Sequence, residues 1–247
     1  MDKELYISNQ IKEKMKGFIL AAGEGTRLYP LTLEIPKPLL PVGKIPVITY
    51  LVDLYLKYGV NDIKINIQQK HLEDFYKWKA TYFPREKIEF IVEPKPSGTF
   101  TPIAKKLDPK WFSRAIVVSN GDELKELNLK KMIDFHKKKK ALVTIGLVKV
   151  KDPGAYGSVK VKNDKIIEFS EKTEKPLSSY INSGLYIMNP GIRKYFKKGA
   201  TFSMLETDLF PKLAKERKLF GYKWKGKWQD VGTWKRWEEA IKHWNKK

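Results

Sequence analysis

The chain has 247 residues and no cysteine, and its 49 Lys and Arg residues outnumber its 28 Asp and Glu residues, giving a net charge of +21. This length suits one large α/β domain with a sizeable core. The lack of cysteine excludes disulfides, thiolate zinc sites and a cysteine nucleophile. No apolar run approaches the ~18 residues of a membrane helix, and residues 1–16 lack the apolar centre of a secretory signal. We therefore expect a soluble cytoplasmic protein.

The positive charge indicates an anionic partner, which could be nucleic acid, an anionic membrane surface or a phosphorylated small molecule. Only six of the basic residues are arginine. Because nucleic-acid readers rely strongly on arginine forks, this composition weighs against nucleic acid. A lysine-rich solvated surface is the simpler alternative, and composition alone does not choose among these.

The first half of the chain alternates between strand and helix patterns, with residues 1–14 as a short extension before it. A parallel sheet with helices on both faces is the expected result. The run of four lysines that ends the last predicted helix is expected to be a solvated turn. The predicted strands are 17–22, 62–67, 87–92 and 115–119, and the predicted helices are 47–58, 71–82 and 128–140.

The second half changes to short strands joined by turns, which favours antiparallel additions to the sheet. These strands are predicted at 141–151, 157–162, 165–170 and 180–188. A closing helix over 233–244 places Trp234, Trp237, Ala240, Ile241 and Trp244 at core spacing. The three histidines (His71, His136 and His243) lie in helical surface patterns, so we expect them to face solvent.

A glycine-rich loop follows the first predicted strand, in the segment L-A-A-G-E-G-T-R-L-Y-P-L-T over residues 20–32. Backbone N–H groups of such a loop can bind a phosphate. The loop is neither a dinucleotide fingerprint, because Leu28 replaces the third glycine, nor a Walker loop. Arg27 offers a fork for a pyrophosphate, and Lys37 is a compact charge between two prolines. The alternative is an ordinary strand-to-helix turn.

Two aspartates from distant segments are candidate ligands for Mg²⁺. Asp122 follows the strand 115–119, at the strand end where open α/β sheets bind ligands, and Asp230 precedes the last helix. Carboxylate oxygens suit Mg²⁺. The alternatives are an Asx turn at Asp122 and a helix cap at Asp230, although Thr233 is better placed as the cap.

These motifs resemble those of the sugar-1-phosphate nucleotidyltransferases, which share L-A-A/G-G-x-G-T-R-L-x-P-L-T followed by P-K-P-L-L-P-V. The resemblance extends from Met15 nearly to the C-terminus. It implies condensation of an NTP with a sugar 1-phosphate, with Mg²⁺, to give an NDP-sugar and pyrophosphate. The further matching segments are Gly98-Thr99, Asn120-Gly121-Asp122, Tyr156-Gly157, 169–172, 181–186 and 226–233.

The resemblance also implies a fold and an organisation. The fold is a Rossmann-like, mostly parallel mixed sheet with helices on both faces and a small antiparallel sugar-binding lobe, similar to glycosyltransferase-A folds. Residues 15–247 are expected to form one domain, with a nucleotide-binding half over about 15–140 and a sugar-phosphate-binding half over 141–247. No C-terminal β-helix domain is expected. The sequence leaves open whether the chain forms a homo-oligomer.

The roles of individual residues follow from the same resemblance. Catalytic roles are implied for Arg27, Lys37 and Lys172, and metal binding for Asp122 and Asp230. The chain departs from the family pattern at Thr173, where a proline usually follows Lys172. Nucleotide binding is implied for Leu20, Ala22, Gly23, Gly25, Thr26, Arg27, Lys37, Glu93, Gly98, Thr99 and Asp122, and sugar-phosphate binding for Gly157, Glu171, Lys172 and Asn182.

The choice of base depends mainly on Glu93. Thymidylyl- and uridylyl-transferring relatives typically have Gln there, whereas a carboxylate only accepts hydrogen bonds and guanine presents two adjacent donors. Pro102 also resembles the G-T-A-G-P of mannose-1-phosphate guanylyltransferases, although Phe100 and Thr101 depart from it. GTP with mannose 1-phosphate or a heptose 1-phosphate is therefore favoured. A glucose-1-phosphate thymidylyl- or uridylyltransferase, a non-catalytic regulatory paralogue and a solvated Glu93 are the alternatives.

Overall fold

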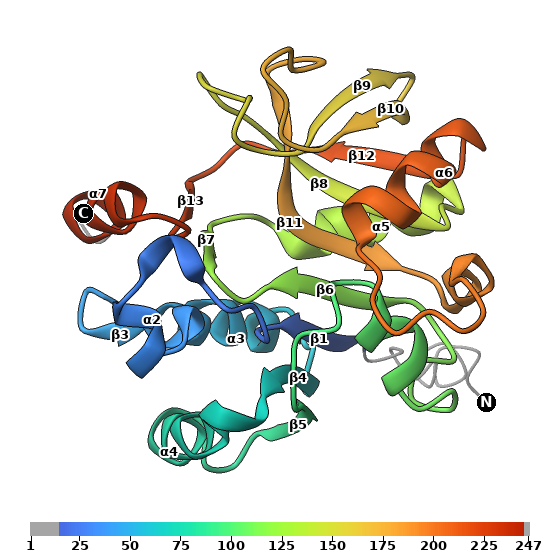
Figure 1. Ribbon diagram of the computed structural model, residues 1–247. Coiled ribbons are helices and arrows are strands. Elements are labelled where there is room, and N and C mark those ends of the chain that lie inside the picture. The colour runs from blue at the N-terminus through green and yellow to red at the C-terminus, as the bar shows by residue number, and fades with distance from the viewer. Residues whose placement is uncertain (1–14, 245–247) are drawn as a thin grey trace, which may run out of the picture.

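The computed structural model describes residues 15–244 (Figure 1), so the predicted extension 1–14 lies outside the described residues. The strands are β1 (Lys16–Leu20), β2 (Pro41–Val42), β3 (Ile45–Pro46), β4 (Asp62–Gln68), β5 (Lys87–Glu93), β6 (Ile116–Asn120), β7 (Glu123–Lys125), β8 (Val143–Lys149), β9 (Ser158–Lys162), β10 (Lys165–Ser170), β11 (Tyr180–Met188), β12 (Leu219–Lys223) and β13 (Trp228–Asp230). The α-helices are α2 (Leu31–Glu34), α3 (Val47–Lys57), α4 (Leu72–Tyr82), α5 (Leu129–Lys139), α6 (Phe210–Lys215) and α7 (Trp234–His243).

Nine of these strands form one mixed sheet in the order β5-β4-β1-β6-β11-β8-β12-β10-β9. The strands β5, β4, β1 and β6 are parallel, as the alternating first half predicted. β11 then runs antiparallel to both β6 and β8, and β10 is antiparallel to β12 and β9. The expectation of a mostly parallel sheet is therefore correct only for the first half, and the predicted small antiparallel lobe is a continuation of the same sheet.

The sheet is packed on both faces because alternate side chains of its central strands enter different cores. Phe18 and Ile19 of β1 are both fully buried. Ile19 packs with side chains of α3, α4 and α5, whereas Phe18 packs with α6 and with the segment 100–112. Figure 1 shows α3 and α4 near one half of the sheet and α6 near the other.

The carboxyl ends of the parallel strands meet at one edge of the sheet. The pairing register places Leu20 opposite Asn120 in the β1–β6 pair and Gln68 opposite Glu93 in the β4–β5 pair. The loops that follow β1, β5 and β6 therefore start side by side. This is the edge at which open α/β sheets bind their ligands.

The closing helix α7 differs from the prediction in the face that it buries. Ala240 and Trp244 are buried in a small core with Val42, Val47, Leu124 and Val231, but Trp234 is 48% and Ile241 49% exposed. The helix packs through one narrow face, so the apolar spacing overstated its burial. Thr233 caps the helix as expected, since its Oγ1 accepts a hydrogen bond from Arg236 N.

Two of the three histidines are buried, contrary to the prediction that they face solvent. His71 is 6% and His136 is 4% exposed. The His136 ring lies between Thr144 Oγ1, 2.8 Å from Nδ1, and Asn189 Nδ2, 3.0 Å from Nε2. This burial lowers the pKa of His136 to about 4. The ring therefore fixes the end of α5 to the sheet as a neutral group.

Strand β12 was absent from the prediction and lies beside β8 in the sheet. Gly221 at its centre permits this packing, because a Cβ there would lie 2.5 Å from Leu147 Cδ1. A central glycine weakens a strand pattern in sequence. Among residues 15–244, no helix is both long enough and apolar enough to cross a membrane.

Candidate functional site

Two adjoining cavities lie at the carboxyl edge of the parallel strands. The larger, of about 360 Å³, lies between the loops after β1, β5 and β6. The smaller, of about 160 Å³, lies between the β6–β7 connection, the segments before β9 and after β10, and the strands β11 and β13. Their shared wall is formed by Asn120, Asp122, Lys172 and Met204. The two cavities therefore meet at residues from both halves of the chain.

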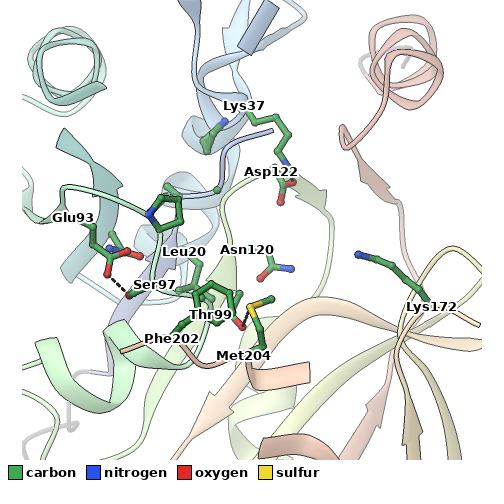
Figure 2. Close-up of a pocket in the computed structure, with 17 residues that line it drawn as sticks. Leu20, Lys37, Glu93, Ser97, Thr99, Asn120, Asp122, Lys172, Phe202 and Met204 are labelled. Atoms are coloured by element: carbon green, nitrogen blue, oxygen red, sulfur yellow. Dashed lines mark hydrogen bonds and ion pairs between the residues drawn. The ribbon is translucent and has the colours of Figure 1, made fainter. Parts of the chain in front are cut away.

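Most of the residues predicted to bind a nucleotide line the larger cavity. Figure 2 shows Glu93 at one end of it and Lys172 extending toward it from the other, with Asn120 and Asp122 between them. The predicted residues in its lining are Leu20, Ala22, Gly23, Lys37, Glu93, Gly98, Thr99 and Asp122. Lining residues to which the sequence assigned no role are Ala21, Pro38, Asn66, Pro96, Ser97, Asn120, Phe202 and Met204, and Lys172 joins them from the predicted sugar-phosphate set.

Three residues of the glycine-rich loop with predicted roles, Gly25, Thr26 and Arg27, do not line either cavity. Gly25 adopts a left-handed conformation with φ of 70°, and its carbonyl accepts a hydrogen bond of 2.9 Å from Thr32 Oγ1. Thr26 and Arg27 follow it in a single exposed turn. The Arg27 guanidinium lies beside the loop at Gly232, where an added Cβ would be 3.0 Å from it and 2.7 Å from Asp230 Oδ1.

Lys37 and Asp122 form an ion pair in the wall of the larger cavity. Lys37 starts a short turn between Pro36 and Pro38, which fixes its backbone. Burial would raise the pKa of the Asp122 carboxyl, but the Lys37 ammonium and the charge of Lys125 hold it below its usual range. Asp122 is therefore ionised, with a cation already beside it.

The loop after β5 is held against the segment 203–206. Gly98 has a φ of 88°, and a Cβ there would lie 2.3 Å from Ser203 O, so this contact requires glycine. Thr99 Oγ1 donates a 2.6 Å hydrogen bond to Glu206 Oε2 and accepts one of 2.8 Å from Leu205 N. The loop after β5, which lines the larger cavity, is thus fixed to Glu206 of the smaller cavity.

The smaller cavity contains all four residues predicted to bind the sugar phosphate. A Cβ at Gly157 would lie 2.7 Å from Glu171 Oε2 and 2.7 Å from Cζ of the buried Phe169 ring, so a larger residue there would displace both side chains. Lys172 Nζ lies 3.4 Å from Glu171 Oε1, and its side chain is 59% exposed. Asn182 Nδ2 donates a 2.9 Å hydrogen bond to Tyr186 OH. The sequence departure at Thr173 leaves Lys172 at this position.

Asp230 is buried at the wall of the smaller cavity, and its carboxylate accepts several hydrogen bonds. Its Oδ2 accepts a 2.7 Å bond from Tyr156 OH, and its Oδ1 accepts 2.9 Å and 3.3 Å bonds from Gly232 N and Arg236 Nη1. In the β7–β13 pair it lies opposite Glu123, the residue after Asp122. The alternative role of Asp230 as the α7 cap is excluded, because Thr233 occupies that position.

The donors at Asp122 and Asp230 fit a hard divalent cation. Both line the smaller cavity and both offer carboxylate oxygens, and Mg²⁺ is commonly held by one or two carboxylates together with substrate phosphates. Across residues 15–244 there is no group of three or more His, Cys, Asp or Glu side chains placed to hold a metal. A metal here would therefore depend on substrate oxygens as well.

Two buried carboxylates in the smaller cavity were missed by the sequence analysis. Glu123 accepts hydrogen bonds from Asn120 Nδ2 and Trp228 Nε1, and burial raises its pKa. Burial likewise raises the pKa of Glu206, with Thr99 opposing the shift. Glu123 could have been noticed as the neighbour of Asp122, but Glu206 lies far from every motif in sequence.

Comparison with known proteins agrees with this geometry. The profile of the family described as Nucleotidyl transferase matches residues 16–247. Mannose-1-phosphate guanylyltransferase of Mycobacterium tuberculosis is 34% identical over 227 residues, covering 87% of this chain and 60% of that protein. The Saccharomyces cerevisiae mannose-1-phosphate guanyltransferase is 35% identical over 225 residues, covering 88% and 61%. The chain thus spans about 60% of the length of these curated relatives.

Two solved structures share the fold. A Bacillus anthracis protein assigned as a glucose-1-phosphate thymidylyltransferase, in complex with sucrose, superposes with a TM-score of 0.83 at 29% identity, covering 92% of this chain and 94% of that one. HddC from Yersinia pseudotuberculosis, complexed with GMP-PN, gives a TM-score of 0.76 at 25% identity, covering 94% and 100%. The resemblance to sugar-1-phosphate nucleotidyltransferases is therefore confirmed, and the chain belongs to the nucleotidyl transferase family.

Proposed function

We propose that this protein condenses an NTP with a sugar 1-phosphate to give an NDP-sugar and pyrophosphate. The observation that carries the proposal is the pair of cavities that share a wall at Asn120, Asp122 and Lys172. A nucleotide in the larger cavity and a sugar phosphate in the smaller would meet at this wall. The division into a nucleotide-binding half over about 15–140 and a sugar-phosphate-binding half over 141–247 belongs to the same proposal.

The reaction that suits this arrangement is direct attack of a sugar-phosphate oxygen on the α-phosphate. That oxygen is already ionised at pH 7, so no general base is needed, and catalysis rests on positioning and charge neutralisation. Lys172 lines both cavities and would hold the sugar phosphate beside the α-phosphate. Glu171, Asn182 and the backbone at Gly157 would contact the sugar ring.

On the nucleotide side, the ion pair of Lys37 with Asp122 would be exchanged on binding. An arriving phosphate gives the Lys37 ammonium a new anionic partner, which frees the Asp122 carboxylate. Asp122 and Asp230 would then hold Mg²⁺, which supplies charge neutralisation at the α-phosphate. The backbone of Leu20, Ala22 and Gly23 would contact the nucleotide.

Arg27 requires a separate account because it lies outside both cavities. It is exposed, so its side chain is free to rotate from the loop at Gly232 toward the triphosphate. We assign it the leaving pyrophosphate, which its fork suits. Gly25 and Thr26 set the position of its backbone. Gly98 and Thr99 would shape the base end of the cavity.

The favoured pair of substrates is GTP with mannose 1-phosphate, or with a heptose 1-phosphate. Glu93 is fully buried and lines the nucleotide cavity, so the solvated alternative is excluded. A carboxylate accepts hydrogen bonds only, and guanine presents the adjacent donors N1–H and N2–H. The names of the curated relatives support the same choice. A thymidylyl- or uridylyltransferase and a non-catalytic paralogue are the competing proposals.

The test is a matrix of five NTPs against a panel of sugar 1-phosphates with Mg²⁺, followed by pyrophosphate release. We expect GTP with mannose 1-phosphate or a heptose 1-phosphate to give the highest kcat/KM. We also expect Glu93→Gln to weaken the preference for GTP. A clear preference for UTP or dTTP would reject the assignment of guanine, and no turnover with any pair would favour the non-catalytic paralogue.

A further inference from the structure

The two oxygens of the Glu93 carboxylate differ in their contacts. Its Oε1 accepts a hydrogen bond from Ser97 Oγ and lies 2.7 Å from Lys106 Nζ. Its Oε2 is buried and has no hydrogen-bond partner. A buried oxygen without a partner is costly. This arrangement therefore indicates that a group outside the protein completes it.

The amide side chains of Asn66 and Gln68, on the neighbouring strand β4, donate hydrogen bonds to backbone carbonyl oxygens and not to Glu93. Gln68, which pairs with Glu93 across β4 and β5, donates its Nε2–H to Ala22 O at 2.9 Å. Asn66, which lines the cavity, donates its Nδ2–H to Ile91 O at 3.2 Å. The described chain therefore satisfies one oxygen of Glu93 and leaves the other for a ligand.

Lys106 reaches Glu93 from outside the nucleotide cavity. It ends the π-helical turn Pro102–Lys106 and lines a separate surface groove of about 490 Å³. Its side chain is 33% exposed, whereas that of Glu93 is 1% exposed. The cation thus pairs with the carboxylate without occupying space where a base would lie. Single π turns are frequent next to functional sites.

We propose that Lys106, assisted by Ser97, is a positioning residue that sets the base specificity of Glu93. This inference rests on the proposed function and adds a new role to it. The Lys106 ammonium and the Ser97 hydroxyl both contact Oε1, so together they fix the orientation of the Glu93 carboxylate. The two donors at Oε1 direct Oε2 toward the base as an acceptor only. A base is then selected by the N–H groups that it presents, and a carbonyl at that position is rejected.

Removal of the Lys106 charge should relax the choice of base. In Lys106→Met the carboxylate loses one of the two groups that hold Oε1, so it can rotate and Oε2 is no longer fixed toward the base. We expect the ratio of kcat/KM for GTP to that for UTP to fall about tenfold, the scale of one charge-assisted hydrogen bond. The change should lie in KM with kcat nearly constant, because base contacts are the same in the ground and transition states.

Matched variants separate this role from general structure. Lys105 precedes Lys106 on the same turn but donates to Ala200 O, at 3.4 Å, and lies over the Phe196 ring, so Lys105→Met should keep the GTP:UTP ratio. Lys106→Arg restores the charge and should restore the ratio. Ser97→Ala removes one donor from Oε1 without changing the charge, and should lower the ratio by a smaller factor.

The outcomes distinguish this inference from the proposed function. If the wild-type protein turns over NTP with a sugar 1-phosphate and prefers GTP, an unchanged GTP:UTP ratio in folded Lys106→Met overturns the inference alone. If Lys106→Met does not fold, an unchanged ratio in Ser97→Ala together with an unchanged ratio in Lys106→Gln overturns it. Absence of turnover in the wild-type protein rejects the proposed function itself.

Discussion

At the scale of single residues, the central feature is the wall shared by the two cavities. Asp122 is ionised and paired with Lys37, and Asp230 is fixed by Tyr156, Gly232 and Arg236. Such fixed charges can stabilise a transition state without reorganising during the reaction. We therefore propose that both aspartates act in the reaction.

Replacing either aspartate with asparagine tests its role in the reaction. Asp122→Asn and Asp230→Asn should each lower kcat/KM about 100-fold or more, because each removes a charge at the reacting phosphate. Asp134→Asn, at an exposed residue paired with Lys130, is the control and should keep full activity. Steady-state kinetics with circular dichroism for folding would check this. Full activity in either site variant would remove that aspartate from the proposed mechanism.

The sequence placed residues together where a motif fixes the backbone. Leu20, Ala22 and Gly23 line the larger cavity, and their contact with a nucleotide stays a prediction. Glu206 was missed, because its place in the site depends on a hydrogen bond to Thr99, 107 residues away in the sequence. Arg27 was predicted correctly as a loop residue, but only the fold shows that it lies beside Gly232.

At the scale of elements, periodicity predicted the longer strands and helices but missed most of the short ones. The predicted elements are β1, β4, β5, β6, β8, β9, β10, β11, α3, α4, α5 and α7, and the missed ones are α2, α6, β2, β3, β7, β12 and β13. Periodicity was less reliable where burial depends on partners distant in sequence. The spacing of apolar residues in α7 is the same whether they meet a core or solvent, so Trp234 and Ile241 were wrongly predicted to be buried. The mixed direction of the sheet arises from β11, which lies antiparallel between β6 and β8, and from β10, which lies antiparallel between β12 and β9.

The junction of α5 with the sheet gives a prediction about pH. The pKa of His136 is lowered to about 4 by burial, whereas an unfolded histidine has a pKa near 6.5. Between these values the unfolded chain binds the additional proton, so the free energy of unfolding should fall as the pH falls from ~6.5 to ~4. The decrease is on the order of 3 kcal/mol, at ~1.4 kcal/mol for each pKa unit.

Urea denaturation across this pH range would measure the effect. His136→Gln should lose that part of the pH dependence, and His243→Gln, at an exposed residue, should keep it. Identical pH profiles for the wild-type protein and His136→Gln would show that His136 does not contribute in this way.

At the scale of the whole molecule, the charge of +21 is mostly a property of the surface. The run 137–140 is exposed or half-buried at the end of α5, as predicted from the sequence. Among the cations at the two cavities, Lys37 and Lys172 line them directly. The remaining positive charge would still concentrate two phosphate-bearing substrates near the site.

The arrangement of the sheet brings residues from both halves of the chain to one edge. The parallel strands end at the larger cavity and residues of both halves line the smaller one, with Asp122 and Lys172 at their boundary. The central claim is therefore transfer of a nucleotidyl group between substrates in neighbouring cavities. A phosphatase or a simple NTP hydrolase would not require the second cavity.

GTP labelled at the α-phosphate, incubated with mannose 1-phosphate or a heptose 1-phosphate and Mg²⁺, tests this claim most directly. We predict that the label appears in a GDP-sugar, with release of unlabelled pyrophosphate only when the sugar phosphate is present. Release of labelled GMP or of inorganic phosphate without any labelled nucleotide sugar, for every NTP tried, would contradict the account.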